Sequence, residues 1–566
     1  MKSFFTLVKL LFIQQYRIKP TGSNKKRTGT IIALIVLALC FLPMLVGLVI
    51  VMYYMGKITG GNVGFCALLM LVCQGLVMLF GLPSIISNVF NCRDADKLLP
   101  LPIRSITVFA AKLTVVYVNE VITTAFVILV TLLPFGIGSV AGVGFYFLLL
   151  LSLVLIPMLP MLVGCLIAMP FVAITEKLSK NGITKTILQI LLFVTVMVLY
   201  ALVMYFTGTV AGSENSTNMD IASMLIQKLQ GLSESMRYIH SNFTLAGAMF
   251  ATSFGGGILL FLISIAENAL LLALVVLMAL GFYKWILRSS LEGTSKARKK
   301  VNNKQLEIKN KGVIKELIFT DLKRVTRDSQ LGFSSLMGVV LLPAMVVVFY
   351  FIFNSAGDNG GSMVEMLKNF SLYQPIASLV ILAYMSMLGI TANYVGIYPI
   401  SRENKSFYLI KSLPISFNKY LLSKVILATF VMFICDLLTC VFVVIFFNIM
   451  WYWGIAMLLA MSMLGFGSMC LTTLIDLKQP KLGWVNFNRS LKNAKNSWFA
   501  MLIGLVSSIA LGLIATPFII WFNNNPMWYV LFIMWVLIII CALVYSIVAY
   551  IIMTKKAQSN FEKIEI

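Results

Sequence analysis

Twelve long apolar runs, separated by polar connections, constrain this chain more than any other feature of its sequence. A helix needs roughly 20 mostly apolar residues to cross the hydrocarbon core of a bilayer, and every run exceeds that length. Because backbone groups in lipid must be hydrogen-bonded internally, such runs predict helices. We therefore expect an all-α polytopic membrane protein with about twelve transmembrane helices. The runs are 30–55, 62–90, 110–137, 142–171, 184–208, 255–286, 331–354, 374–397, 420–448, 451–475, 498–522 and 527–553.

The balance of residue types excludes the class of soluble globular proteins. Hydrophobic residues make up 60% of the chain and charged residues 11%, and the mean hydropathy is +0.96. Of the 44 Lys and Arg residues, 40 fall in alternate connections or at the chain ends. Since positive charge accumulates on the cytoplasmic side, this asymmetry predicts a multi-pass protein of the cell membrane with both termini in the cytoplasm. An anionic leaflet accounts for the net charge of +24, so no nucleic-acid partner is expected.

Cysteine and histidine give no sign of a metal centre or a catalytic site. The nine cysteines lie mostly within apolar runs and show no metal-ligand or CxxC spacing, which favours small core hydrophobes. His240 is the only histidine and falls in the long connection 209–253, where we expect a solvated loop residue. A zinc site or a histidine proton relay needs partners that this sequence lacks. We expect a chain that is not itself an enzyme.

A polar motif occurs twice and indicates an internal repeat. The tripeptide LPI is followed by a lysine ten residues after its proline in both copies, and the two copies are offset by 312 residues. The matched pairs are Pro102 with Pro414 and Lys112 with Lys424. Two six-helix halves of the same sense are the economical architecture. The predicted units are residues 1–288, a charged cytoplasmic linker at 289–312, and residues 313–566.

The segment VIKELIFTDLKRV, residues 313–325, predicts an amphipathic helix that lies in the membrane interface. We assign its apolar stripe to Val313, Leu317, Ile318, Leu322 and Val325, and its polar face to Lys315, Glu316, Asp321 and Arg324. Residues 3–18 are the expected counterpart in the first half, with a weaker polar face.

Each half also carries a polar interruption after its second span. The segments 91–104 and 400–416 each begin with an arginine and an acid, continue through an amphipathic turn or two, and reach the helix-breaking proline of LPI. A single copy is typical of an ordinary hydrophilic loop. Two copies at the same position favour a short helix parallel to the membrane, facing the cytoplasm.

This arrangement resembles the type-2 exporter permeases of the ATP-binding cassette (ABC) superfamily, in their fused double-length form. The shared elements are an interfacial helix, two spans, a polar segment such as RDADKLLPLPI or SRENKSFYLIKSLPI, and four spans with an outer excursion before the last. The resemblance implies that the two polar segments carry the helices that couple to the ATPase. It assigns this role to Arg93, Asp94, Asp96, Pro102, Arg402, Glu403 and Pro414.

The energy source implied by the resemblance lies outside this chain. The sequence has no GxxxxGK[ST] phosphate loop; the nearest approach, Gly56-Lys57, lacks the first glycine. The resemblance therefore implies that two copies of a separate cytoplasmic ATPase bind ATP and magnesium, and that this chain holds no cofactor. The sequence departs from the pattern in one respect, because the outer excursion is long at 209–253 but short at 522–526.

Three acids inside apolar runs are candidates for a pathway or a seam between the halves: Glu120, Asp436 and Glu267. An ionised carboxylate facing lipid costs about 2.5–3.5 kcal/mol, so these groups should face the bundle interior or be protonated. We hypothesise that Glu120 and Asp436 lie on either side of the seam. The alternative is a structural hydrogen bond between two helices, worth about 1 kcal/mol.

We expect an ABC exporter permease that moves an amphipathic or hydrophobic substrate, such as a peptide, a lipid or a drug. An ion-driven secondary transporter with twelve spans in two halves is the main alternative. A peptide-sensing or immunity subunit that moves nothing is also open. A polytopic membrane enzyme would require clustered acids or histidines at the membrane surface, and the single His240 argues against it.

Overall fold

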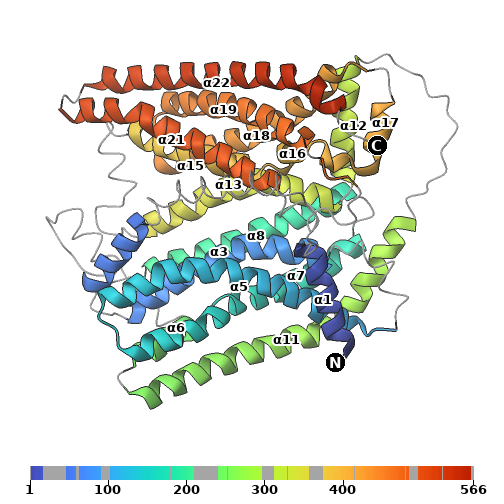
Figure 1. Ribbon diagram of the computed structural model, residues 1–566. Helices are drawn as coiled ribbons and strands as arrows, with labels where there is room; N and C mark the ends of the chain where they lie inside the picture. The colour runs from blue at the N-terminus through green and yellow to red at the C-terminus, as the bar shows by residue number, and fades with distance from the viewer. Residues whose placement is uncertain are drawn as a thin grey trace, which may run out of the picture.

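The computed structural model confirms the all-α expectation, since helices are its only regular elements in the part that it describes (Figure 1). The described residues are 2–16, 46–58, 63–90, 102–178, 182–209, 240–251, 253–295, 312–327, 329–355, 374–412, 415–478, 480–482, 495–524 and 527–562. Within them, helical residues overlap every one of the predicted apolar runs.

Eight spans among the described residues are long and apolar enough to cross a membrane. They are Ser105–Gly138, Val143–Thr175, Gly255–Ile286, Gln374–Ala392, Phe417–Phe447, Trp451–Lys478, Asn496–Phe522 and Trp528–Ser559. The other predicted runs contain the shorter apolar helices Val46–Ile58, Val63–Gly75, Ile183–Leu199 and Leu336–Val347.

The first half is divided into helices of unequal length, and one division has a clear cause. Pro157 lies between the two helices of the fourth run, where its ring and missing N–H favour a break. The helices are α1 (Lys2–Tyr16), α3 (Val63–Ile85), η1 (Ile86–Phe90), α5 (Ser105–Gly138), α6 (Val143–Leu155), α7 (Met158–Leu178), α8 (Gly182–Thr209), α10 (His240–Met249) and α11 (Phe254–Ser295).

The second half has the same order of spans, and its fourth span is unbroken. Its helices are α12 (Val313–Arg327), α13 (Ser329–Ser355), α15 (Gln374–Ala392), α16 (Tyr394–Ile397), η4 (Ser401–Ser406), α17 (Phe407–Lys411), α18 (Phe417–Phe447), α19 (Trp451–Lys478), α21 (Lys495–Asn524) and α22 (Trp528–Glu562).

The two predicted interfacial helices lie at one end of the bundle and run across the direction of the spans (Figure 1). We call this end, where both chain ends also lie, the terminal end. Leu7 and Leu11 of α1 are buried against Ala111 and Val115 of α5. In the second half, α12 packs on α18, which is the matching third span. The amphipathic pattern therefore predicted the two helices, and the structure adds that each packs on the third span of its half.

One detail of the predicted polar face of α12 is wrong. Asp321 is only 3% exposed and lies on the inner face with the apolar stripe. Helical register explains this, because Asp321 stands four residues after Leu317 and four before Val325, and residues with this spacing share one face. Lys315 and Glu316 are exposed, as predicted.

The same helix pairs pack in both halves. The second and fourth spans pack together (α3 with α7; α15 with α19), as do the fourth and sixth (α7 with α11; α19 with α22). Across the halves, the main packing is between α8 and α13. The largest core cluster contains buried residues of both halves, among them Phe193 and Leu342. Apolar packing between the fifth span of the first half and the first span of the second half therefore joins the two halves.

Two connections contain more helix than the sequence predicted. The helix α10 lies within the predicted outer loop 209–253 and packs on α3 and α11. The last span of the first half continues as α11 through Ser295, so the first residues of the predicted linker 289–312 are helical. The linker residues 296–311 lie outside the described residues.

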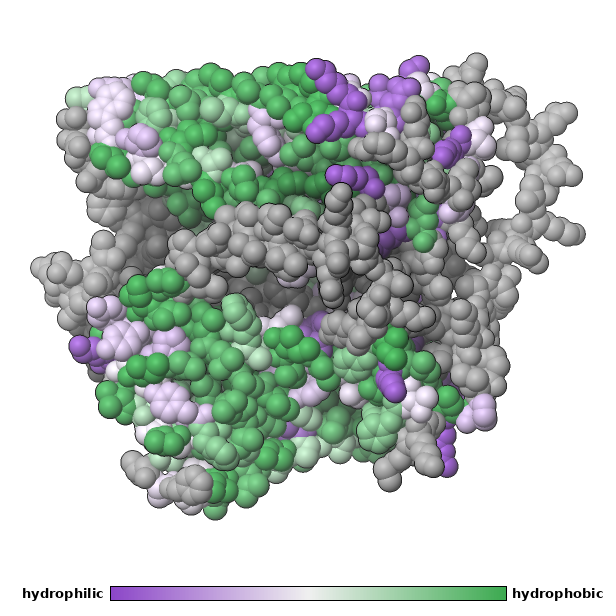
Figure 2. Space-filling model, in the orientation of Figure 1, coloured by the Kyte–Doolittle hydropathy of each residue, from purple (hydrophilic) through white to green (hydrophobic). Residues whose placement is uncertain are grey.

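The surface agrees with a protein surrounded by lipid. Figure 2 shows mostly apolar residues over the spans of both halves, with hydrophilic residues gathered toward the terminal end of the second half. Large apolar side chains such as Leu277, Leu513 and Phe532 are more than half exposed. Such exposure of large apolar side chains along whole helices is expected when the surrounding medium is hydrocarbon.

Candidate functional site

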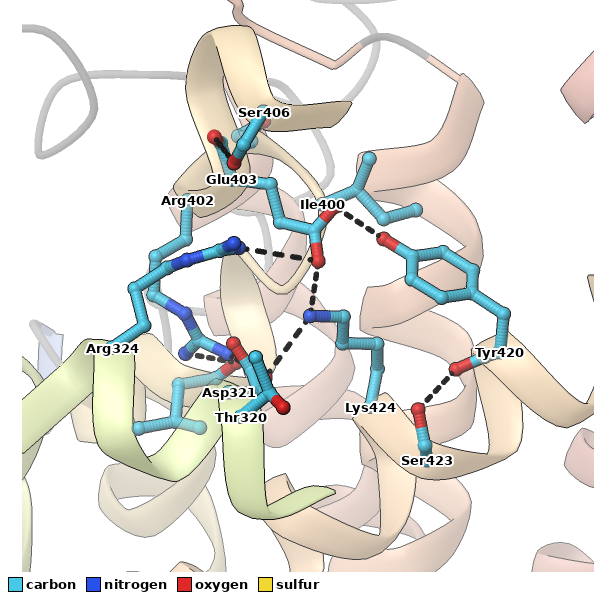
Figure 3. A network of polar contacts seen from close by, with 12 residues as sticks. Thr320, Asp321, Arg324, Ile400, Arg402, Glu403, Ser406, Tyr420, Ser423 and Lys424 are labelled. Carbon is cyan, nitrogen blue, oxygen red and sulfur yellow. Dashed lines mark hydrogen bonds and ion pairs between the residues drawn. The ribbon is translucent and has the colours of Figure 1, made fainter. Parts of the chain in front are cut away.

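A network of charged side chains joins three segments of the second half at the terminal end (Figure 3). Asp321 and Arg324 come from α12, Arg402 and Glu403 from η4, and Lys424 from α18. Four of the five are nearly fully buried, and Arg324 has 31% of its side chain exposed. The interfacial helix, the segment after the second span and the third span are thus held together by ions.

Asp321 accepts from two cations on different segments. Its Oδ2 lies 2.5 Å from Nη2 of Arg402 and 3.1 Å from Nζ of Lys424. Burial by itself raises the pKa of Asp321, but the positive charges of Arg402 and Lys424 outweigh it and hold the pKa below the ordinary value. The carboxylate therefore stays ionised at neutral pH and ties α12 to both other segments.

Glu403 lies on the other side of Lys424 and, like Asp321, pairs with two cations. Its Oε1 lies 2.5 Å from Nζ of Lys424 and 3.4 Å from Nη1 of Arg324. Its Oε2 accepts a hydrogen bond of 2.8 Å from the hydroxyl of Tyr420. Lys424 thus bridges the two carboxylates, with its ammonium 5.4 Å from the centre of the Tyr420 ring.

A third carboxylate, Asp476 at the end of α19, fixes the backbone at the start of η4. Its Oδ2 accepts from the backbone N–H groups of Ile400 and Ser401 at 2.8 and 2.9 Å. Its Oδ1 accepts from Oγ of Ser401 at 2.5 Å and from Nδ2 of Asn496 at 2.8 Å. Four donors satisfy this fully buried group, so η4 begins at a position set by the fourth span.

These contacts favour a structural role, in which α12, η4 and α18 are held together, over a catalytic role. Every charged member has an opposite charge within 3.4 Å, and the acids are occupied by cations of this chain. Breaking a buried ion pair by removing one partner costs about 3–5 kcal/mol, because the other charge stays buried without compensation. Among the described residues, no cluster of three or more His, Cys, Asp or Glu side chains could hold a metal ion.

The burial of Arg402 and Glu403 corrects one expectation drawn from the polar interruptions. The two side chains are 1% and 4% exposed, so they do not form an exposed docking face, and a change at Glu403 disturbs buried contacts. On the neighbouring α17, Tyr408 is 39% exposed. Of the other predicted coupling residues, Pro102 is exposed, and Arg93, Asp94, Asp96 and Pro414 lie outside the described residues.

Glu120 and Asp436 are buried, as predicted, each within the third span of its own half. Glu120 lies beside α3, where a Cβ on Gly81 would stand 3.5 Å from its carboxyl carbon. Asp436 is 3% exposed, and its Oδ2 has no hydrogen-bond partner among the described residues. The main packing across the halves is between α8 and α13, and the placement of Glu120 and Asp436 on either side of the seam stays a prediction. A role in lining a pathway stays a prediction.

Glu267 has a different setting, in a band of polar contacts between α3, α10 and α11. Its Oε1 lies 2.6 Å from Nδ1 of His240, the first residue of α10. His240 is therefore not a free loop residue, although 71% of its side chain is exposed. Nearby, Gln74 and Asn242 exchange two hydrogen bonds of 2.8 Å. The structure thus brings Glu267 to α10.

Comparison with known protein families gives one match, which covers residues 27–549 and carries the description "membrane protein of 12 TMs" (12TM_1). The chain belongs to this family. The family agrees with the twelve apolar runs and makes this 12TM_1 protein a multi-pass membrane protein. Comparisons with curated proteins and with solved structures gave no match.

Two of the buried residues at this site are not identified from the sequence. Lys424 enters there only as part of the repeat, and Asp476 is not included. Asp321 is assigned to the polar face of its helix, although the spacing to Leu317 predicts the inner face. An acid in the middle of an apolar stripe is the signal that points to a buried cation opposite it.

Proposed function

We propose that this chain is the membrane permease of an ABC exporter for an amphipathic or hydrophobic substrate. Two copies of a separate cytoplasmic ATPase bind ATP and magnesium and press on the terminal end of the permease. The two halves then move against each other, which opens the pathway to alternate sides of the membrane.

The observation that carries this proposal is the attachment of η4 at the terminal end. This short element follows the second span, where the resemblance to type-2 exporter permeases expects the coupling segment. Buried ions connect it to α12 and α18, and Asp476 connects it to α19. A push on this segment therefore acts on three helices at once, as a coupling element requires.

The buried and the exposed residues of this segment have different roles in the proposal. Arg402 and Glu403 are buried and act as positioning residues, which hold the segment in place from beneath. The contact with the ATPase falls to exposed residues of the adjacent α17, and Tyr408 is the largest of these that is described as exposed. This division replaces the expectation that Glu403 itself meets the partner.

The test is the substrate-stimulated ATP hydrolysis of the permease purified together with its ATPase. Tyr408→Ala removes an exposed aromatic side chain, so the complex is expected to lose most of its stimulation while the permease keeps its thermal stability. Lys315→Ala, on the exposed face of α12, is the matched control and should keep full stimulation. Full stimulation in Tyr408→Ala would remove α17 from the coupling surface, and failure of any ATPase to purify with the chain would overturn the exporter proposal.

One observation favours a second candidate, an ion-coupled secondary transporter. Asp436 is a buried carboxylate in the middle of a span, and one of its oxygens lacks a partner among the described residues. Such groups occur in proton and ion relays. Transport that stops with a protonophore and continues after ATP depletion, and that is lost in Asp436→Asn, would favour this candidate over the exporter.

A further inference from the structure

A groove opens between α7 and α11 on the flank of the first half. It has a volume of about 460 Å³ and is lined by Pro170, Ala173, Ile174, Gly281, Phe282 and Trp285. All six are apolar residues, and Ile174, Phe282 and Trp285 are 40–54% exposed. Both walls belong to spans, so the medium outside the groove is hydrocarbon. The molecule available to fill a groove in this position is therefore the acyl chain of a lipid.

Gly281 creates the open space in the wall of the groove. A Cβ built on this glycine would meet no atom within 4 Å. The opposite face of the same helix turn is tightly packed, because Tyr283 and Ile286 are buried in the core and the Tyr283 ring lies 5.1 Å from that of Phe109. The groove is therefore a local feature of one face of α11 rather than loose packing of the helix.

The groove lies near the terminal end, where a lipid headgroup would be placed. Gly281 to Trp285 are the last residues of the apolar span that ends at Ile286. Trp285 is a residue type that favours the boundary between hydrocarbon and headgroups. Lys284 is exposed and directly precedes Trp285, so a positive charge lies next in sequence to a residue that lines the groove. The pattern of an apolar cleft with a cation next in sequence to its lining fits an anionic amphiphile.

The matching helix pair of the second half contains a tightly packed glycine. On α19, a Cβ at Gly467 would stand 2.6 Å from the Tyr545 ring of α22 and 3.1 Å from the Cα of Ser546. Both pairs of helices pack together, but Gly281 of the first half faces open space whereas Gly467 of the second half does not.

We propose that the groove binds one acyl chain of an anionic phospholipid from the leaflet at the terminal end, with its headgroup at Lys284. The site is independent of the exporter proposal, because it depends only on α7, α11 and the surrounding bilayer. It gives the first half a bound lipid where the second half has a tightly packed glycine.

Native mass spectrometry of the full chain in detergent, titrated with phosphatidylglycerol and with phosphatidylcholine, tests this site. We expect one phosphatidylglycerol to bind more tightly than the others. The Cβ of Gly281→Leu enters open space and the rest of its side chain occupies the cleft, so this variant should weaken the binding about tenfold or more. Lys284→Gln removes one charge near an anionic headgroup, which predicts a weakening of about fivefold.

Gly255→Leu is the matched control, because Gly255 lies on the same helix and a Cβ there also meets no atom within 4 Å. It should bind phosphatidylglycerol like the unchanged protein. Unchanged tight binding in Gly281→Leu would overturn the site, and equal binding of the two lipids would overturn the headgroup assignment.

A second measurement uses the unchanged protein, in case Gly281→Leu fails to fold. Trp285 is the only tryptophan before residue 451, so its fluorescence can be isolated as the difference from Trp285→Phe. Vesicles that contain brominated phosphatidylglycerol should quench this difference more than vesicles with brominated phosphatidylcholine. Equal quenching by the two lipids would overturn the proposal.

Discussion

The two halves use a matched lysine in different surroundings. Lys112 and Lys424 stand 312 residues apart, at the terminal ends of the two third spans, and are 1% and 3% exposed. In the second half the lysine meets Asp321 of the interfacial helix. The alignment of the two interfacial helices that pairs Arg17 with Arg324 places the neutral Gln14 at the position of Asp321. The repeat therefore preserves the buried lysine, while the residue aligned with Asp321 differs between the two interfacial helices.

The halves also differ at their opposite ends. Between the fifth and sixth spans the first half inserts α10, which packs between α3 and α11 and pairs His240 with Glu267. In the second half α21 ends at Asn524 and α22 begins at Trp528, which leaves no room for such a helix. Among the described residues, the ionic network lies in the second half and the inserted helix in the first.

The largest effect is expected from removing the cation that both carboxylates share. Lys424→Ala leaves Asp321 and Glu403 buried beside fewer positive charges, so the free energy of unfolding should fall by about 3–5 kcal/mol. Lys112→Ala is the matched variant in the first half, and it tests whether the loss depends on an acid at the position of Asp321. Thermal unfolding of both variants in one detergent measures the difference. Equal losses would show that the two halves hold their lysines in the same way.

A pH-dependent effect is expected from Asp321. Its pKa lies below the ordinary value of 3.8, so the unfolded chain binds its proton more readily than the folded one. The stability that it contributes is therefore complete above about pH 3.8 and is lost as the pH falls through the lower pKa of the folded protein.

Asp321→Asn should lower the free energy of unfolding at neutral pH by about 2–3 kcal/mol and flatten this acid dependence. Glu316→Gln, on the exposed face of the same helix, is the control and should change neither property. Unfolding midpoints of the two variants and the unchanged protein, measured from neutral to acid pH, test both expectations. An acid dependence that survives in Asp321→Asn would assign it to other carboxyl groups.

The smallest expected effect comes from substituting two glycines, one packed between α19 and α22 and one that faces the groove between α7 and α11. Gly467→Ala places a methyl group against Tyr545, so it should lower the free energy of unfolding by about 1–2 kcal/mol. Gly281→Ala meets open space and improves helix propensity, so the stability should hold or rise by up to about 1 kcal/mol. Thermal unfolding compares them directly. Destabilisation by Gly281→Ala would indicate that the groove between α7 and α11 closes in the folded protein.

The sequence by itself determined the elements that depend on local periodicity. A run of apolar residues long enough to cross a bilayer has no other stable outcome in lipid than a helix, so each predicted run contains one. The amphipathic pattern of residues 313–325 likewise predicted the helix α12. Membership of a family of 12-span membrane proteins agrees with the same count.

Only the tertiary structure decided which polar residues meet. The burial of Arg402 and Glu403 depends on α12 and α18 closing over η4, and sequence distance does not reveal that closure. The pairing of His240 with Glu267 requires α10 to fold back on α11, within a connection that reads as a loop. The physical reason is that hydropathy reports the preference of each residue for lipid or water. A buried charge instead depends on a partner brought from another segment, and that partner is set by packing alone.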